Sequence, residues 1–429
     1  MSAGTRDAVP ASRTFAYRNG VLAVEAVPLS RVAEQAGTPC YVYSASALDD
    51  AFRAIDAALE PGPRLIAYAL KANANLALLR RLANLGAGAD IVSGGELARA
   101  LAAGFDPARI VFSGVGKTDA EITAALATQI RSIHVESEPE LDVVEEIAKS
   151  RGVKAPIALR INPDVDPRTH PYIATGLREA KFGLTLDVAR RLLPRIVRSP
   201  HLALEGVACH IGSLVQSAAL GEAVEIAARF AAECAAAGAP VRTLDAGGGW
   251  PIAYGNEEAA VDDAATIGRT IRAAMQRGGA GKLDLVIEPG RSIVGDAGVL
   301  LTRVVYVKEQ HDKRFVIVDA AMTELVRPAL YDAYHAIVPV TEPAAHAQRT
   351  PADVVGPVCE TGDFLARGRA LPPLARGDLL AVRGAGAYAA SMAMNYNARP
   401  FAPEVLVQGE RMELIRRRQT LESLWRDEV

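Results

Sequence analysis

Short apolar runs alternate with longer amphipathic stretches from residue 64 onward. Eight such runs are LIAYAL, ADIVS, RIVFSG, SIHVES, IALRIN, EGVACHIG, RTLDAGGG and DLVIEPG. The segments between them, such as EPELDVVEEIAKSRG, place apolar residues at the spacing of an amphipathic helix. Alternating strands and helices predict a parallel sheet with right-handed crossovers. Eight units of this kind predict a (β/α)8 barrel, with an open doubly wound sheet as the alternative.

The pattern changes after residue 297. The runs VLLTRVVYVKEQ, KRFVIVDAAM, DLLAVRGAGAY and EVLVQGERMELIRRR read as strands joined by turns, which predicts a second, mostly antiparallel β domain. Near the start of the chain, TFAYRNGVLAVE and PCYVYS also read as strands, and we expect them to join the C-terminal sheet, so that the β domain is discontinuous. The predicted division is therefore 1–44 with 297–429 in the β domain, and 45–296 in the barrel.

Composition and charge exclude several classes of protein. The 429 residues are half hydrophobic and carry a net charge of −3, so neither nucleic acid nor an anionic membrane is expected as a partner. No apolar run is long enough for a transmembrane helix. The opening stretch MSAGTRDAVPASRT lacks the apolar core of a signal peptide and is expected to be a disordered lead. Four widely spaced cysteines without a CxxC pair indicate free thiols, no zinc site and a cytoplasmic location.

Polar residues lie at or near the end of each predicted barrel strand. They are Lys71, Asp90, Ser93, Ser113, Glu136, Arg160, Asn162, His210, the glycines 247–249 and Glu288. In a barrel these strand ends meet at the C-terminal rim, where active sites of this architecture lie. One polar strand end carries little information, but eight on the same rim predict a functional site.

Lys71 follows the strand-like run LIAYAL. A lysine in this position is commonly a surface residue with a solvated amine. By the period of two, however, Lys71 shares a face with Ala67 and Ala69, whose small side chains leave room for a large group. A partly desolvated lysine amine suits Schiff-base chemistry.

Two glycine-rich turns follow the last two predicted strands. LDAGGGW and EPGRS can form cradles of backbone N–H groups for an anion, although each could be only a tight turn. Glu288 can face a protonated pyridine nitrogen, or form an ion pair with Arg160 or Arg291. His210 can stack on a flat ring, or be a satisfied core histidine. Together with Lys71, these features predict a pyridoxal phosphate site.

The chain resembles the diaminopimelate decarboxylase family, within the fold-type III, alanine-racemase-like group of pyridoxal-phosphate enzymes. The motifs that carry the resemblance are YALKANAN, GADIVSGGEL, FSGVGK, RINPDVDPRTHPYIATG, KFG, CHIGS, DAGGG, EPGRSIVG, RPALYDAYH, GPVCETGDFLA and GAGAYAASMAMNYNARP. The resemblance implies a carboxy-lyase that converts meso-2,6-diaminopimelate to L-lysine and CO2, the last step of lysine biosynthesis.

The resemblance also implies roles for residues around the cofactor. Lys71 is implied to form the Schiff base, His210 to stack on the ring and Glu288 to pair with the pyridine nitrogen. The implied phosphate ligands are Ser213, Gly247, Gly248, Gly249, Gly290, Arg291 and Tyr388. Asp90 and Arg160 are implied to surround the lysine.

The implied substrate-binding residues are Arg291, Arg327, Tyr331, Glu360 and Tyr388. Cations are expected to hold the distal carboxylate of the substrate, and an acid its distal amine. Cys359 is implied to donate a proton from the partner subunit of a homodimer. It also lies in the polar, turn-rich stretch GPVCETGD, where a reactive thiol is more typical than a packing one.

Other functions stay open at this point. A related decarboxylase for ornithine, lysine, arginine or carboxynorspermidine is the main alternative, although RPALY and CE favour a substrate with a zwitterionic far end. A racemase is less favoured, because CE stands where a tyrosine base is expected. A non-catalytic protein that binds pyridoxal phosphate is the alternative from another class. Departures from the family pattern occur at Leu214, Trp250, Pro251 and Thr323.

Overall fold

The computed structural model describes residues 14–166, 176, 180–256 and 261–429. The chain forms two compact units that alternate along the sequence. The β unit comprises Met1–Ala51, Ile252–Val261 and Arg291–Val429, and the barrel unit comprises Phe52–Pro251 and Asp262–Gly290. The domain limits expected from the sequence stay a prediction, and the expected disordered lead lies, except for Thr14, outside the described residues.

Eight parallel strands form the barrel. They are β5 (Arg64–Ala69), β6 (Gly88–Ile91), β7 (Ile110–Phe112), β8 (Ser132–Val135), β9 (Ala155–Ile161), β10 (Leu202–Cys209), β11 (Thr243–Asp245) and β12 (Asp284–Ile287). They pair in chain order, and β12 closes the ring against β5. The (β/α)8 prediction is therefore confirmed, and the open sheet is excluded.

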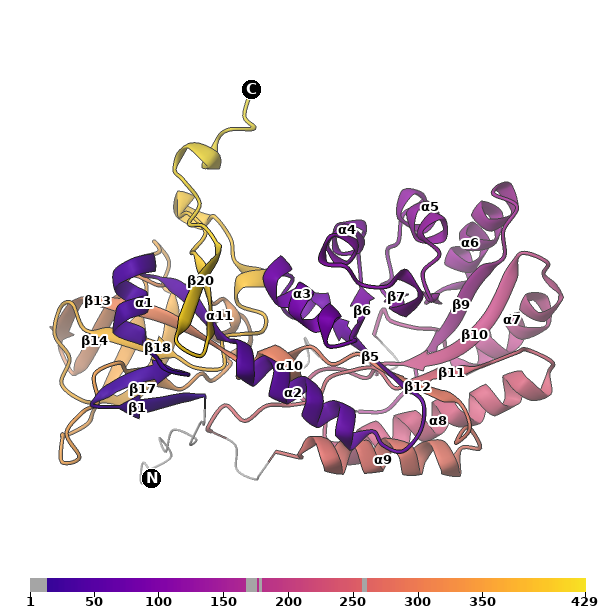
Figure 1. The fold of residues 1–429 in the computed structure, drawn as a ribbon, viewed down its shortest axis with the longest axis horizontal. Coiled ribbons are helices and arrows are strands. Elements are labelled where there is room, and N and C mark those ends of the chain that lie inside the picture. Colours follow the sequence, from indigo (N-terminus) through magenta and orange to yellow (C-terminus); the bar gives the residue numbers. More distant parts are fainter. Residues whose placement is uncertain (1–13, 167–175, 177–179, 257–260) are drawn as a thin grey trace. The chain divides into compact units, whose positions relative to one another are not determined.

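Helices lie outside this ring of strands (Figure 1). They are α2 (Ala45–Ala58), α3 (Leu76–Asn84), α4 (Gly94–Ala103), α5 (Asp119–Thr128), α6 (Glu138–Ser150), α7 (Leu186–Arg198), α8 (Ser217–Ala236) and α9 (Ala264–Arg277). Side-chain caps fix several starts: Ser93, Thr118 and Ser137 each accept a hydrogen bond from a backbone N–H in the first turn. These caps direct the chain from a strand end straight into the next helix.

A buried apolar cluster joins three of the barrel strands. Leu65, Ala67, Val111 and Val286 form a buried cluster from β5, β7 and β12. Leu65 and Ala67 lie on the same face of β5, as the period of two predicts. One apolar face of β5 is therefore buried against neighbouring barrel strands.

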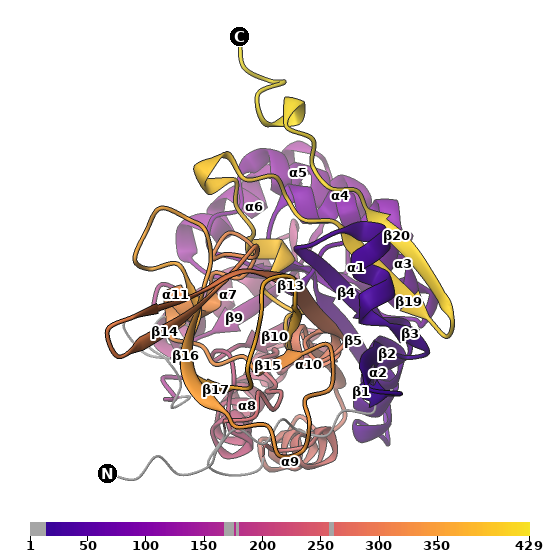
Figure 2. The same cartoon turned by 90° about the vertical axis from the view of Figure 1, so that its left-hand side faces the viewer.

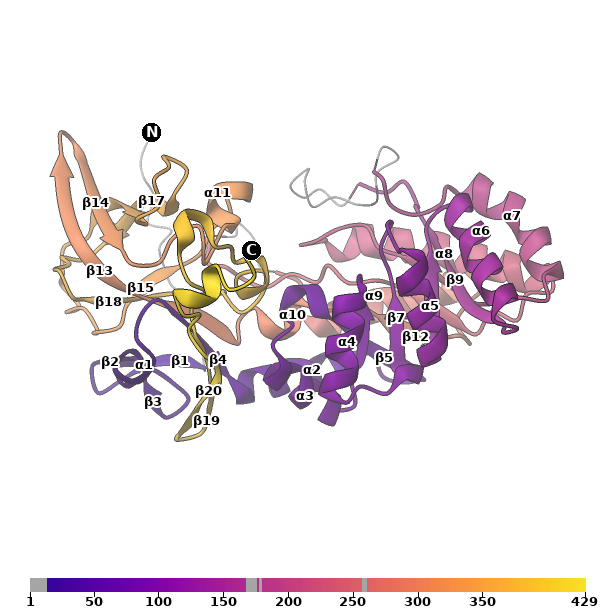
Figure 3. The same ribbon diagram turned by 90° about the horizontal axis from the view of Figure 1, so that it is seen from above.

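The β unit is built around a nine-stranded sheet. Its strands are β4 (Cys40–Ser44), β13 (Gly298–Gln310), β14 (Lys313–Val318), β15 (Ile337–Pro339), β16 (Thr350–Val355), β17 (Phe364–Leu371), β18 (Leu379–Val382), β19 (Glu404–Gln408) and β20 (Arg411–Arg416). Most pairs are antiparallel, and β13 and β14 form a long hairpin (Figure 3). The predicted second domain is confirmed as a mostly antiparallel β structure.

The N-terminal strands divide between two sheets. β4 lies between β13 and β19, as Figure 2 shows, so PCYVYS joins the C-terminal sheet as expected. TFAYRNGVLAVE instead forms β1 (Phe15–Arg18) and β2 (Val21–Val24), which pair with β3 (Val27–Pro28) in a separate three-stranded sheet. The expectation that this stretch joins the large sheet was wrong. Its apolar face is nevertheless buried in the same core, which includes Val24, Val42 and Leu301.

Among the helices of the described residues, none is both long enough and apolar enough to cross a membrane.

Removing the Leu301 side chain should destabilise the β unit. Leu301 lies on β13 and is fully buried, so Leu301→Ala leaves a cavity and should lower the free energy of unfolding by about 2–5 kcal/mol. Leu414→Ala on β20, where the leucine is 51% exposed, should change it by less than about 0.5 kcal/mol. Denaturant unfolding followed by circular dichroism measures both. Equal losses would contradict this account of the core.

Candidate active site

Lys71 lies directly beyond β5 and not within it. The strand ends at Ala69, and Lys71 occupies the short 3-10 helix η1 (Leu70–Ala72), so the period of two does not extend to this residue. Its Nζ lies 2.6 Å from Oδ2 of Asp90, a fully buried residue on β6. The ion pair holds the amine close to the barrel strands, while a third of the side chain stays exposed. The structure thus brings these two predicted residues together.

The backbone of Gly290 packs closely against residues near Lys71. A Cβ atom on Gly290 would lie 2.8 Å from Cβ of Ala72 and 3.2 Å from Cβ of Ala69. The chain after β12 can approach Ala69 and Ala72 only because residue 290 lacks a side chain. A glycine is therefore required at this position beside the lysine turn.

Arg160 forms its ion pair with Glu136. Nη1 of Arg160, on β9, lies 2.9 Å from Oε1 of Glu136, and both side chains are buried. Glu136 also accepts hydrogen bonds from the backbone N–H groups of Gly114 and Gly183. This network fixes the arginine side chain and neutralises its charge. The alternative of an ion pair between Glu288 and Arg160 is not what the structure shows.

Glu288 is a buried acid with few polar partners. It follows β12, and its Oε1 accepts a hydrogen bond from Oγ of Ser113 at 3.2 Å. Burial raises the pKa of the Glu288 carboxyl well above its ordinary value of 4.5, and the acids Asp245 and Asp90 raise it further. The cations Lys71 and Arg160 lower this pKa only in part, so Glu288 tends to keep its proton.

His134 and Asp245 extend this buried network and were not among the predicted site residues. Nδ1 of His134 lies 3.1 Å from Oγ of Ser113 and 3.6 Å from Glu288, and its Nε2 lies 3.8 Å from Asp245. Burial lowers the pKa of His134 to about 3, so the ring is neutral. The period of two in SIHVES places His134 on the same face as Glu136, and this signal could have identified it.

His210 contacts the glycine run. Its Nδ1 accepts a hydrogen bond from the N–H of Gly248 at 3.1 Å and lies 3.9 Å from Oε2 of Glu288. Burial lowers the pKa of His210 well below its ordinary value. The N–H of Gly247 is donated to Asp245. The N–H groups of Gly247 and Gly248 therefore already donate hydrogen bonds within the protein. In this glycine run, only the N–H of Gly249 has no acceptor among the described residues.

The glycines of this run are required by close backbone contacts. A Cβ atom on Gly248 would lie 2.0 Å from the carbonyl oxygen of Glu288. Gly249 has φ +86°, and its Cβ would lie 2.0 Å from the carbonyl oxygen of Gly212. The neighbouring Ser213 is half-buried, and Leu214 has φ +59°. The backbone is thus folded tightly at the predicted phosphate loop.

The remaining predicted residues belong to the β unit. Arg291 begins α10 (Arg291–Val294), Arg327 begins α11 (Arg327–Tyr331), and both are buried. The guanidinium carbon of Arg291 lies 4.7 Å from the ring centre of Tyr388. Tyr331 and Tyr388 are half-buried. The two arginines are brought together by Tyr254, a residue that the sequence analysis did not select.

Cys359 and Glu360 are exposed. The backbone N–H of Cys359 donates to Oδ1 of Asn397 at 2.9 Å, which fixes the loop that carries the thiol. The other cysteines are buried, and burial raises the pKa of Cys40 and Cys234 to about 12. Cys359 is therefore the accessible thiol of the described chain.

Comparison with known proteins identifies the class. Residues 46–295 match the family described as pyridoxal-dependent decarboxylase, pyridoxal binding domain, so the barrel is that of a pyridoxal-dependent decarboxylase. The chain is 50% identical to the diaminopimelate decarboxylase of Pseudomonas aeruginosa, over 97% of this chain and 98% of the relative. The chain belongs to the diaminopimelate decarboxylase family.

Solved structures agree with this assignment. Diaminopimelate decarboxylase from Helicobacter pylori, complexed with L-lysine, has a TM-score of 0.88 and 43% identity, covering 93% of this chain and 98% of that one. The enzyme from M. jannaschii, also with L-lysine, has a TM-score of 0.91 and 35% identity, covering 97% and 98%. Fold and sequence therefore indicate the same family.

The barrel residues fit pyridoxal phosphate, the cofactor of this family. Oδ1 of Asp90 and Oδ2 of Asp245 are buried without a hydrogen-bond partner among the described residues, so the barrel holds more acidic oxygens than its own donors satisfy. A protonated pyridine ring would supply positive charge here, with Glu288 as the acid that would accept its N–H. Lys71 would supply the amine for the cofactor aldehyde.

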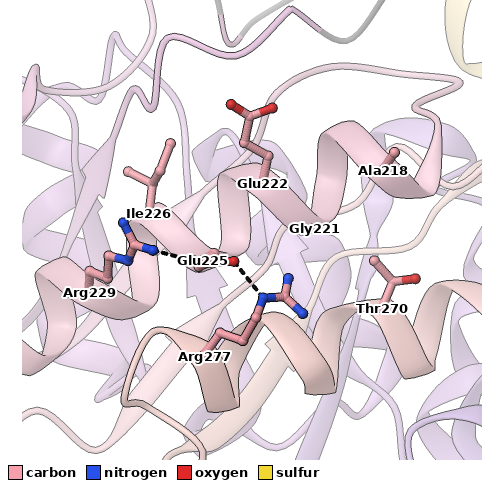
Figure 4. Close-up of a pocket in the computed structure, with 8 residues that line it drawn as sticks. All are labelled: Ala218, Gly221, Glu222, Glu225, Ile226, Arg229, Thr270 and Arg277. Atoms are coloured by element: carbon pink, nitrogen blue, oxygen red, sulfur yellow. Dashed lines mark hydrogen bonds and ion pairs between the residues drawn. The ribbon is translucent and has the colours of Figure 1, made fainter.

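A separate groove of about 570 Å³ lies on the outside of the barrel, along α8 and α9 (Figure 4). Its arginines, Arg229 and Arg277, both point toward Glu225 and form ion pairs with it. No residue predicted for the active site lines this groove, so it plays no part in the site described above.

Replacing Glu288 should stabilise the cofactor-free protein at alkaline pH. A raised pKa means that the folded state binds a proton which the unfolded state releases above pH 4.5. The wild type should therefore lose stability as pH rises from 4.5 toward the folded-state pKa, by up to about 1.4 kcal/mol per pH unit. Glu288→Gln removes this dependence and should be more stable than wild type at pH 8 but not at pH 4.5. Denaturant unfolding at both pH values measures the difference.

The matched control is Glu146→Gln, because Glu146 is exposed on α6 of the same unit. It should follow the wild-type dependence on pH. A Glu288→Gln protein that is less stable than wild type at pH 8 contradicts the assignment of a raised pKa.

Proposed function

We propose that this enzyme decarboxylates meso-2,6-diaminopimelate to L-lysine and CO2, as the last step of lysine biosynthesis. The observation that carries the choice of substrate is the buried pair Arg291 and Arg327, for which the described residues provide no carboxylate partner within 4.0 Å. Two uncompensated guanidinium groups suit a substrate with a second carboxylate. The relatives named as diaminopimelate decarboxylases support this choice.

Bound pyridoxal phosphate supplies a cationic ring that accepts the electron pair left when CO2 departs. Lys71 would carry the cofactor covalently through Nζ, and Asp90, 2.6 Å away, would orient that nitrogen. Glu288 would keep the pyridine nitrogen protonated, and His210 would stack on the ring. The proposed phosphate ligands are Ser213, Gly247, Gly248, Gly249, Gly290, Arg291 and Tyr388. The N–H groups of Gly247 and Gly248 already donate to other residues. Among the three glycines, Gly249 is therefore the strongest proposed phosphate ligand.

The groups of the β unit bind the far end of the substrate. Arg291, Arg327 and Tyr331 hold the distal carboxylate, with Tyr388 beside Arg291. Glu360 holds the distal ammonium group. A substrate without the distal carboxylate leaves two buried cations without a counterion, which disfavours ornithine and other simple diamino acids.

Cys359 donates the proton that replaces the lost carboxylate. The S–H bond breaks as the new C–H bond forms, and the thiolate regains its proton from water. We propose that Cys359 and Glu360 act on the site of the partner subunit in a homodimer, which agrees with their exposure on the single chain. The three buried free cysteines suit a reducing compartment, proposed to be the cytoplasm.

A panel of amino acids tests the substrate. The purified protein is incubated with pyridoxal phosphate and meso-diaminopimelate, lysine, ornithine, arginine or carboxynorspermidine, and CO2 release is measured. We expect release from meso-diaminopimelate, with every other rate lower by at least about a hundred-fold. Lys71→Ala should lose both the visible absorbance of the bound cofactor and the activity. Release from another substrate instead supports the related decarboxylases, and no release from any supports a non-catalytic binding protein.

Replacing Cys359 should slow the reaction without weakening cofactor binding. Cys359→Ala removes the acid, so kcat should fall by roughly 10²- to 10⁴-fold, with little change in KM or in cofactor absorbance. Cys234→Ala changes a buried thiol outside the site and should keep the wild-type kcat.

Mixing two inactive variants tests the shared site. If Cys359 acts across the interface, dimers formed from Lys71→Ala and Cys359→Ala chains contain one intact site. Denaturation and renaturation of an equal mixture should then restore about a quarter of the wild-type activity. No recovery in a mixture that has re-formed dimers places both residues in the same subunit.

A further inference from the structure

Tyr254 lies at the centre of the arginine pair. Its side chain is buried, and its phenolic oxygen accepts a hydrogen bond from Nη1 of Arg291 at 2.6 Å and another from Nη1 of Arg327 at 2.9 Å. The two donor atoms therefore cannot lie farther apart than the sum of these distances. The Nη1 atoms of Arg291 and Arg327 are thus held by the same phenolic oxygen.

His335 fixes one of these arginines from the other side. Its Nδ1 lies 2.8 Å from the carbonyl oxygen of Arg383, and a carbonyl can only accept, so Nδ1 carries the proton. Nε2 therefore accepts a hydrogen bond from Nη1 of Arg327 at 2.8 Å. Burial lowers the pKa of His335 to about 3, which keeps the ring neutral. The imidazole thus positions Arg327 without neutralising it.

The Tyr254 ring is held in place by its surroundings. The ring of His335 packs against it edge to face, with centres 5.0 Å apart at 75°. Gly384 has φ +64°, and a Cβ atom there would lie 3.0 Å from Cε1 of Tyr254. A side chain at residue 384 would displace the ring. The backbone is therefore shaped to accept a tyrosine at residue 254.

This arrangement holds two like charges together with neutral acceptors. Elsewhere in the described structure a buried arginine such as Arg160 is paired with a carboxylate. Here burial lowers the pKa of Arg327, and the neighbouring Arg291 adds to this effect, yet both guanidinium groups stay charged. Two fixed and uncompensated cations form a preorganised site for one carboxylate.

We propose that Tyr254 is a positioning residue that sets the spacing of Arg291 and Arg327, and that it thereby makes the site selective for a ligand bearing the distal carboxylate. His335 assists by orienting Arg327. This inference rests on the proposed function, because it concerns the carboxylate that the reaction leaves unchanged. That carboxylate is retained in L-lysine, whereas cadaverine has the same two amines and no carboxylate.

Ligand binding to the cofactor-loaded enzyme tests the proposal without relying on turnover. Isothermal titration calorimetry compares L-lysine with cadaverine on the wild type and on Tyr254→Phe, which keeps the ring and removes only the phenolic oxygen. We expect the affinity for L-lysine to fall by roughly ten- to hundred-fold, because a hydrogen bond to each charged group is lost. The affinity for cadaverine and the cofactor absorbance should stay unchanged. Tyr306→Phe, at a tyrosine 54% exposed on β13, is the matched control and should affect neither ligand.

Two variants at residue 335 give a second measure. His335→Leu removes the acceptor for Arg327 and should weaken L-lysine selectively, by less than Tyr254→Phe does. His335→Gln keeps an acceptor and should restore much of the affinity. If Tyr254→Phe does not fold, the two variants at residue 335 test the proposal instead.

The outcomes separate this inference from the proposed function. Equal losses for L-lysine and cadaverine show a merely structural role and overturn the proposal, as does an unchanged affinity for L-lysine. If the wild type releases no CO2 from meso-diaminopimelate, the proposed function fails, while the selective loss of carboxylate binding can still be measured. For an active enzyme, the same variant should raise KM for meso-diaminopimelate more than it lowers kcat.

Discussion

Burial of charge without a complete set of partners is the constraint on which the functional architecture depends. In the barrel unit, Asp90, Asp245 and Glu288 are buried, and two of their carboxylate oxygens have no hydrogen-bond partner among the described residues. Lys71 neutralises one of these acids at 2.6 Å, and Ser113 gives Glu288 a neutral hydrogen bond. Such an arrangement is costly in the empty protein. The same arrangement is favourable when a cationic ring binds. Part of the free energy lost in the empty protein is therefore regained when the cofactor binds.

The β unit also buries charged groups without a complete set of partners, but there the charge is positive. Arg291 and Arg327 are buried cations whose nearest polar partners are the neutral side chains of Tyr254 and His335. Neutral acceptors orient a guanidinium group without cancelling its field, whereas a carboxylate would do both. One unit is therefore prepared for a cation and the other for an anion. Each unit thus holds charge of one sign that only a ligand of the opposite sign can neutralise.

The barrel and its rim could be predicted from the sequence because their signals are local. A strand shows as an apolar run, and parallel strands place their ends together, so the pattern alone was enough to select Lys71, Asp90, Arg160 and Glu288. The separate N-terminal sheet was missed because an apolar run does not specify its pairing partner. Tyr254 and His335 were missed for a related reason: neither belongs to a strand end, and each acts through an arginine whose position in space the sequence pattern does not give.

The place of β4 in the sheet has a consequence for biosynthesis. This strand is made near the beginning of the chain, yet its neighbours β13 and β19 follow the whole barrel. As a nascent chain emerges from the ribosome, the residues of β4 have no partners while the barrel strands appear and close. An apolar strand with both edges open is a template for pairing with other chains. The order of synthesis thus leaves Cys40–Ser44 without its pairing partners until the whole barrel has been made.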